Sequence, residues 1–323
     1  LPGLSRLRKR FPQAHLAWVV KRGLADILRG HDELDQLIEL PAARGWRQVP
    51  EFLGVLRQLR REHFDLAIDM QGLLRSGLMT WATRAPRRLG YRHAREGAHF
   101  AYTDTVDARY WEMPALDHYR LFAQQLGCPG EPPAARLPIT AEQRATIAAR
   151  IAGLPRPLLA IHAGAQWETY RWPPASFAWL ANKAIEKYGV GVMLLGGPGE
   201  KPLADEVATQ LTGPVVNLAE TTRLPELAAA AEAADVFLAG DTGPMHLAAA
   251  VGTRVVSVFT CTSPLRAGPR GSQNLVVATQ VACAASYLKK CPHMKCMNEL
   301  TPQRVWPALA SQLEAARGNR KAG

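Results

Sequence analysis

Short apolar runs alternate along this chain with longer stretches of helical periodicity. The runs are rich in branched side chains and bounded by glycine or proline, which is typical of strands buried on both faces. The strands expected from these runs are residues 15–20, 66–70, 157–162, 190–195, 236–239 and 255–259. The helices expected between them are residues 50–62, 116–126, 141–152, 175–188, 201–211 and 224–233. Strand alternating with helix predicts an α/β fold with parallel sheets covered by helices on both faces.

The chain has 323 residues, which is too long for one small core and suits two domains. Residues 127–138 hold four prolines and two glycines, so a boundary is expected here or shortly after it. A predicted helix and a fresh strand follow, and we therefore place the first domain at residues 1–150 and the second at 151–323. The last helix is expected to begin at Thr301-Pro302, a hydroxyl cap followed by proline.

Several classes of protein find no support in the sequence. Five cysteines are an odd and sparse set for this length, which favours a reducing, cytoplasmic setting. The sequence shows neither a run of ~18 apolar residues nor a basic-then-apolar leader, so membrane spanning and secretion are not expected. Walker, nucleophile-elbow, zincin and nucleic-acid signatures are absent as well.

The net charge of +11 is unevenly placed. Residues 70–95 contain no acidic residue, and the chain carries arginine at six positions there: Arg75, Arg84, Arg87, Arg88, Arg92 and Arg95. Such a run forms either a solvated basic face or a surface for an anionic partner such as phosphate, nucleic acid or lipid headgroups.

The second half has three glycine-containing turns, each after a predicted strand. In the segment VFLAGDTGPMHL, Thr242 can cap a helix, and Gly243 lets a phosphate approach free amides at its start. His246 falls one turn into that helix, although an ordinary capped turn with a core histidine explains the same pattern. The turns at residues 161–173 and 195–200 have the same strand-to-helix setting. Together the three turns favour a nucleotide-type ligand in the second domain.

Polar groups also follow the predicted strand at residues 66–70. Asp69 and Gln71 stand at its end, and Arg75 begins the next helix. These side chains are suited to the hydroxyls of a sugar-like acceptor. An ionised Asp69 could act as a base, but a buried structural role is an equal alternative.

Three cysteines and a histidine gather near the C-terminus as Cys283, Cys291, His293 and Cys296. Four soft ligands could hold zinc, yet their spacing matches no familiar zinc motif. Buried thiols are therefore the preferred interpretation, and no metal is expected.

The segments GDTGPMHLAAAVGT, HAGAQWETYRWP and IDMQGLLRSG resemble the ADP-heptose:lipopolysaccharide heptosyltransferases of glycosyltransferase family 9. IDMQGLLRSG, together with the Arg95-Glu96 pair, most resembles the heptosyltransferase I branch. The resemblance runs from Leu1 to about residue 310. It implies a GT-B fold, in which two Rossmann-like domains carry parallel sheets that face each other across a cleft. The first domain would bind the acceptor, and the second would bind the nucleotide sugar.

The implied activity is inverting, metal-independent and cofactor-free transfer of heptose from ADP-heptose to the Kdo sugars of lipid A. The implied location is the inner face of the cytoplasmic membrane, in peripheral contact with it. By matching position, the donor would be held by Asp241, Thr242, Gly243, His246, Gly164 and Arg171. The acceptor side would be lined by Asp69, Gln71, Arg75 and Arg95. The acid-free arginine run thereby gains a candidate partner, because the acceptor is carboxylated and phosphorylated.

The sequence departs from the family pattern in two places. Tyr170 stands where relatives usually have a lysine that contacts donor phosphate, and a neutral phenol cannot replace that charge. The opening strand of the family, and the loop whose Asp is the catalytic base, have no counterpart in this sequence. The chain is therefore expected to be inactive or severely impaired, with Asp69 a weak substitute base. Three alternatives stay open: another sugar nucleotide or acceptor, a non-catalytic nucleotide-sugar-binding protein and, ranked lowest, a nucleic-acid-binding protein.

Overall fold

The computed structural model describes residues 2–41, 49–108, 113–128, 130 and 136–321. The chain forms two compact units, Leu1–Pro138 and Ile139–Gly323, and each is described by itself. Within the described ranges, every helix is too short or too polar to cross a membrane.

Unit 1 contains two parallel sheets. The first pairs β1 (Ala17–Lys21) with β2 (Gln36–Leu40), and the second has the order β3 (Leu66–Ile68), β4 (Arg87–Tyr91), β5 (Asp104–Val106). The accompanying helices are α1 (Pro2–Arg10), α2 (Arg22–Ala25), α3 (Val49–Arg61), α4 (Leu74–Ala82), the 3-10 turn η2 (Ala98–Ala101) and α5 (Ala115–Gln125). One apolar cluster joins β4 to α5 through Leu89 and Phe122, and another joins β2 to α3 and α4 through Ile38, Leu59 and Met79.

Unit 2 is built on one six-stranded parallel sheet with the order β11-β10-β9-β6-β7-β8. Its strands are β6 (Leu158–His162), β7 (Gly191–Leu195), β8 (Val215–Asn217), β9 (Val236–Gly240), β10 (Arg254–Phe259) and β11 (Leu275–Ala278). Its helices are α6 (Ala141–Ile151), the 3-10 turn η3 (Glu168–Tyr170), α7 (Pro174–Tyr188), α8 (Lys201–Ala208), α9 (Leu224–Ala233), α10 (Gly243–Ala250), α11 (Pro264–Ala267), α12 (Lys295–Glu299) and α13 (Pro302–Lys321).

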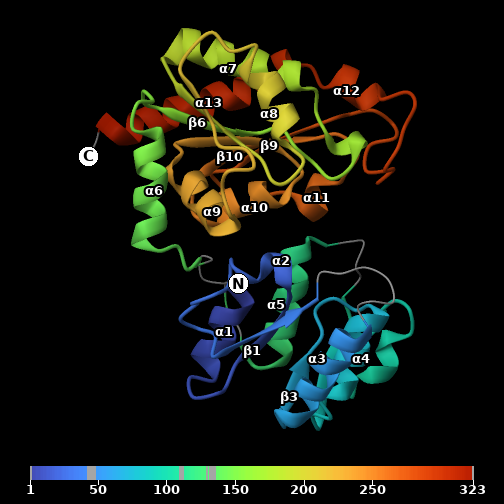
Figure 1. The fold of residues 1–323 in the computed structure, drawn as a ribbon. Helices are drawn as coiled ribbons and strands as arrows, with labels where there is room; N and C mark the ends of the chain where they lie inside the picture. Colours follow the sequence, from blue (N-terminus) through green and yellow to red (C-terminus); the bar gives the residue numbers. More distant parts are fainter. Residues whose placement is uncertain (1, 42–48, 109–112, 129, 131–135, 322–323) are drawn as a thin grey trace. The chain divides into compact units, whose positions relative to one another are not determined.

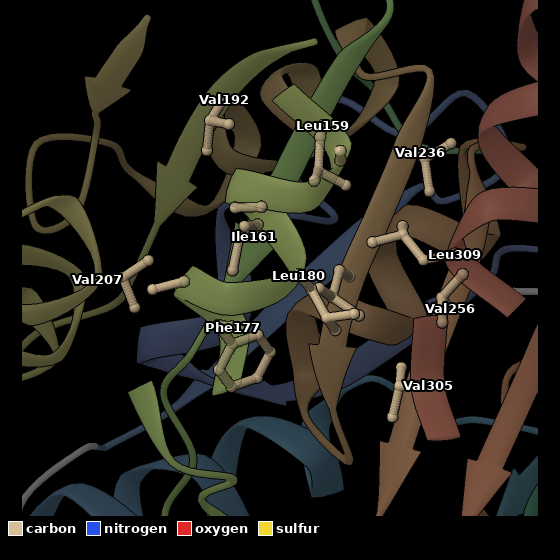
Figure 2. Close-up of a cluster of buried hydrophobic side chains, with 14 of the residues drawn as sticks. Leu159, Ile161, Phe177, Leu180, Val192, Val207, Val236, Val256, Val305 and Leu309 are labelled. Atoms are coloured by element: carbon tan, nitrogen blue, oxygen red, sulfur yellow. The ribbon is translucent and has the colours of Figure 1, made fainter. Parts of the chain in front are cut away.

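Helices cover both faces of this sheet, with α7, α8 and α13 on one face and α9 and α10 on the other (Figure 1). Successive side chains of a strand point to opposite faces. Leu159 and Ile161 of β6 therefore share a face and pack with Leu180 of α7 and Leu309 of α13 (Figure 2). Because both faces are covered, β6, β7 and β9 are buried along their whole length.

The strand order places β6 beside β9 in the middle of the sheet. From β6 the chain adds β7 and β8 on one side, and from β9 it adds β10 and β11 on the other. The loops that leave β6 and β9 therefore diverge, and in open α/β sheets this switch point is where ligands bind.

The predicted α/β class with parallel sheets is confirmed, and each predicted strand overlaps an observed one. Sequence reasoning missed β2, β4, β5, β8 and β11. The chain divides between Pro138 and Ile139 rather than near residue 150. The reason is that α6 packs against α9, where the Arg144 guanidinium donates to Glu232 at 2.6 and 3.0 Å. Part of the proline-rich stretch lies outside the described residues.

Candidate functional site

The junction between β9 and α10 lies at the switch point of unit 2. Thr242 is the N-cap of α10, and its Oγ1 accepts a hydrogen bond from the Met245 amide at 3.5 Å. Gly243 is the first residue of the helix, and a Cβ built on it would meet no atom within 4 Å. The first amides of a helix have no partner within the helix and carry the positive end of its dipole. This junction can therefore receive an anion.

Two titratable side chains flank this helix start. Burial raises the pKa of Asp241 above its usual value, although a hydrogen bond with Thr262 and the nearby His246 act in the opposite direction. Burial lowers the pKa of His246, and Asp241 opposes that shift. His246 is consequently uncharged at neutral pH, so it offers a hydrogen bond rather than a full charge.

The loop after β6 forms the other side of the switch point. His162 Nε2 lies 3.0 Å from Glu200 Oε2, and the same oxygen accepts the Gly197 amide at 2.7 Å. Burial, the largest single effect, favours the neutral form of Glu200. The hydrogen bonds from His162 and the Gly197 amide, together with the charges of His162 and Arg171, outweigh it, so the pKa of this carboxyl is lowered. A Cβ on Gly164 would lie 2.2 Å from Glu200 Oε1, so a side chain at this position would displace the carboxylate from His162. A carboxylate and a histidine thus line the loop predicted to hold the donor.

Arg171, predicted on the donor side, is partly used within its own loop. Its Nε donates to the Ala165 carbonyl at 2.7 Å, and its charge helps to lower the pKa of Glu200. The Arg171 guanidinium therefore lies close enough to Glu200 for their charges to interact.

Tyr170 connects the two loops of the switch point. A Cβ on Gly240 would lie 3.2 Å from the Tyr170 carbonyl oxygen, so η3 lies directly against the end of β9. Burial, followed by the charges of Cys261 and Asp241, raises the pKa of the Tyr170 phenol, while Arg266 opposes the shift. A neutral phenol therefore stands beside Asp241.

In unit 1, the loop after β3 is organised by Asp69, which is 4% exposed. Its Oδ1 accepts the amides of Gln71 and Gly72 at 2.8 and 3.0 Å, and its Oδ2 accepts the Tyr102 hydroxyl at 2.7 Å. Burial, followed by this hydrogen bond, raises the pKa of Tyr102, which keeps the hydroxyl a donor. Three hydrogen bonds from the protein favour the structural role for Asp69 over the role of a base.

The other predicted acceptor-side residues gather around the same loop. The Arg95 amide donates to the Gly72 carbonyl at 2.9 Å, which ties the turn after β4 to the loop after β3. Gln71 is exposed and Arg75 is half-buried in the first turn of α4. The structure therefore brings Asp69, Gln71, Arg75 and Arg95 to one end of the β3–β4 pair.

The cysteine group near the C-terminus has mixed surroundings. Cys283 is exposed, Cys291 is half-buried and Cys296 is buried, and all three are free thiols. Across the described ranges, no three His, Cys, Asp or Glu side chains gather in a way that could hold a metal ion.

Sequence reasoning missed two parts of these sites. It noted the glycine-rich turn before Glu200 but did not pair Glu200 with His162, because that contact depends on β6 and β7 being neighbours. It also missed Tyr102, which reaches Asp69 only because Gly90 has no side chain in its way.

Comparison with known proteins finds relatives and solved structures that align over nearly the whole chain. Lipopolysaccharide heptosyltransferase 1 of Pseudomonas aeruginosa is 29% identical over 347 aligned positions, which cover 98% of this chain and 93% of the relative. The glycosyltransferase family 9 structure from Veillonella parvula aligns over 97% of this chain and 92% of that one, with a TM-score of 0.85 and 22% identity. The E. coli heptosyltransferase WaaC, solved with ADP, aligns over 96% and 94% with a TM-score of 0.74 and 21% identity.

These two structures share the fold of this chain, and the GT-B expectation is confirmed at that level. The model of glycosyltransferase family 9 (heptosyltransferase) matches residues 53–297, about three quarters of the sequence. The chain therefore belongs to glycosyltransferase family 9, the heptosyltransferases.

Proposed function

We propose that this chain is an inverting heptosyltransferase that moves heptose from ADP-heptose to the Kdo sugars of lipid A in the lipopolysaccharide core. The observation that carries the proposal is the capped start of α10 at the switch point of unit 2, beside Asp241 and His246. Family membership and the relative from P. aeruginosa support the sugar and the pathway. The WaaC structure, solved with ADP, supports the nucleotide.

The donor diphosphate would lie at the amide of Gly243. Transfer breaks the bond between the sugar C1 and the diphosphate oxygen, and negative charge develops on the departing ADP. A helix start aimed at that oxygen stabilises this charge without reorganisation. Glu200 and Arg171 would complete the donor side, and neutral His246 would supply a hydrogen bond close to the leaving group.

The acceptor would bind at the β3–β4 end of unit 1. Arg75 and Arg95 would attract the carboxylates and phosphates of a Kdo-lipid A molecule, and Gln71 would bind its hydroxyls. Asp69 would hold the loop that carries Gln71. Because the acceptor is linked to a lipid, the enzyme would work in peripheral contact with the inner membrane surface.

The nucleotide part of the proposal is tested by calorimetric titration of the full chain with ADP. Gly243→Ala adds a methyl group into open space beside the helix start, so we expect it to fold normally and to weaken ADP binding at least tenfold. Gly318→Ala in α13, where a Cβ also meets no atom within 4 Å, is the matched control. Equal ADP affinity in both variants contradicts this placement of the diphosphate.

The transfer itself is tested by ADP release and by mass spectrometry of the acceptor with ADP-heptose and Kdo-lipid A. ADP binding without transfer would support the alternative of a non-catalytic nucleotide-sugar-binding protein. Tyr170 in place of the family's lysine favours testing the donor as well. A panel of ADP- and UDP-sugars under the same conditions shows whether another sugar nucleotide is preferred.

A further inference from the structure

Helix α4 presents a row of apolar side chains to solvent. Leu74, Leu78 and Trp81 are 49%, 41% and 62% exposed, and their spacing of four and three residues places them on one face of the helix. The opposite face is buried against unit 1, with Met79 in the cluster that joins α4 to α3. A surface helix normally turns its apolar face inward, so this second apolar face is not explained by the core.

The neighbouring turn η2 adds an aromatic side chain. Phe100 is 84% exposed, which is the highest value among the large exposed apolar side chains of the described residues. A Cβ on Gly77 would lie 2.9 Å from the Cβ of Ala98, so α4 and η2 are in direct contact. Two adjoining elements therefore carry four exposed apolar side chains, which we call the α4–η2 face.

The charge around this face is positive. Arg84 follows the end of α4 and is exposed, and Arg75 and Arg95 lie near its start. Glu96, the first acidic residue after this arginine run, accepts the Leu74 amide at 3.0 Å and is thus held at the positive end of the helix dipole. Residues 70–95 themselves contain no acidic residue. An apolar face bordered by arginine is complementary to a surface that has an anionic outer layer over an apolar interior.

We propose that the α4–η2 face docks on an anionic lipid surface, with Trp81 and Phe100 entering the headgroup region and Arg84 binding lipid phosphates. Aromatic side chains are favoured at the membrane interface, and each arginine near an anionic bilayer adds to the attraction. A second copy of the chain is a poorer occupant, because it would bring two arginine-rich faces together.

Binding of this face to lipid does not depend on the proposed function. Only its suggested role, the presentation of a lipid-linked acceptor, rests on that function. Helix α4 begins two residues after Gly72, whose carbonyl accepts the Arg95 amide. The α4–η2 face is therefore continuous with the loop proposed to bind the acceptor. A lipid surface held there places the sugars of a lipid-linked acceptor beside Gln71.

The test is flotation of the full chain with vesicles of phosphatidylcholine alone or mixed with phosphatidylglycerol. We expect binding to the mixed vesicles only, and its loss at high salt. The double variant Trp81→Ser/Phe100→Ser should lower the partition coefficient at least tenfold, and Arg84→Gln should lower it severalfold. Leu24→Ser in α2 removes a side chain that is 50% exposed elsewhere in unit 1 and serves as the matched control.

Thermal unfolding of every variant shows whether a loss of flotation comes from misfolding. ADP titration of every variant tests the proposed function separately from the docking. The double variant should match the unaltered chain in both, and should also match it in transfer to an acceptor stripped of its acyl chains. Equal flotation of the double variant and of Leu24→Ser overturns the docking. A concentration-dependent dimer that the double variant abolishes also overturns it, in favour of a second copy. Vesicle binding that survives in a chain that neither binds ADP nor transfers heptose overturns the proposed function and leaves the docking in place.

Discussion

Gly90→Ala should disturb the buried hydrogen bond that orders the loop after β3. A Cβ on Gly90 would lie 2.2–2.5 Å from three ring atoms of Tyr102. Because carbon atoms need about 3.5 Å, the ring must move by more than 1 Å. The hydroxyl then loses its 2.7 Å contact with Asp69 Oδ2.

The expected cost combines two effects. Overpacking a filled site costs about 1–3 kcal/mol, and the loss of a hydrogen bond to a charged group costs about 1.5–3 kcal/mol. We therefore expect Gly90→Ala to lower the free energy of unfolding of unit 1 by about 3–5 kcal/mol. Tyr102→Phe, which removes only the hydroxyl, should cost about 1.5–3 kcal/mol.

Urea unfolding of the full chain, followed by a signal assigned to unit 1, measures both changes. If the clash with the ring is the cause, Gly90→Ala should cost at least about 1 kcal/mol less when Tyr102 is already alanine. The reasoning is refuted by a Gly90→Ala variant within about 0.5 kcal/mol of the unaltered chain. An equal cost of Gly90→Ala in both backgrounds refutes it too.

Three further predictions concern the candidate sites. Asp69→Asn keeps an oxygen that accepts the Gln71 and Gly72 amides, so the rate of transfer should fall less than about tenfold. If Asp69 were the general base, the same change would lower the rate about 10²–10⁴-fold and remove one limb of the pH–rate profile. Tyr170→Lys places a cation beside the donor diphosphate and should tighten ADP binding about fivefold to tenfold in calorimetry, while Tyr170→Phe should leave it unchanged. Because the pKa of Glu200 is lowered in the folded state, its stabilisation is present above the unfolded-state pKa and is lost as the pH falls through the folded-state pKa. Glu200→Gln should therefore destabilise unit 2 by about 1–3 kcal/mol at pH 7 and flatten its stability profile in acid, and a profile parallel to that of the unaltered chain would contradict this.

The sequence allowed unit 2 to be predicted more fully than unit 1. The strands β6, β7, β9 and β10 are buried on both faces, so they are continuous apolar runs that need no tertiary information. By contrast, β4 has the sequence RRLGY, in which two arginines and a glycine leave no apolar run that would indicate a strand. The strand β2 is only half-buried and has the sequence QLIEL, whose polar residues interrupt the apolar run expected of a buried strand.

The candidate sites could be predicted from sequence where the functional residues are consecutive in the chain. Asp241, Thr242 and Gly243 are consecutive, so one motif locates a strand end, a cap and an anion site together. Glu200 and His162 are 38 residues apart and meet only because β6 and β7 are neighbours. Tyr102 meets Asp69 across 33 residues through a gap left by one glycine. Contacts of this kind depend on sheet order, which the local pattern does not contain.

The pairing of β6 with β9 also determines how unit 2 would respond to an occupied site. The pairing holds together two half-sheets that the chain builds separately, β6 to β8 and then β9 to β11. A nucleotide bound to the loops that leave both strands adds its binding free energy to the cost of separating the halves, about 2.7 kcal/mol at a concentration 100 times Kd. Substrate supply would then act on the lifetime of the folded protein as well as on its rate of turnover, since a cell poor in donor would hold a less stable enzyme.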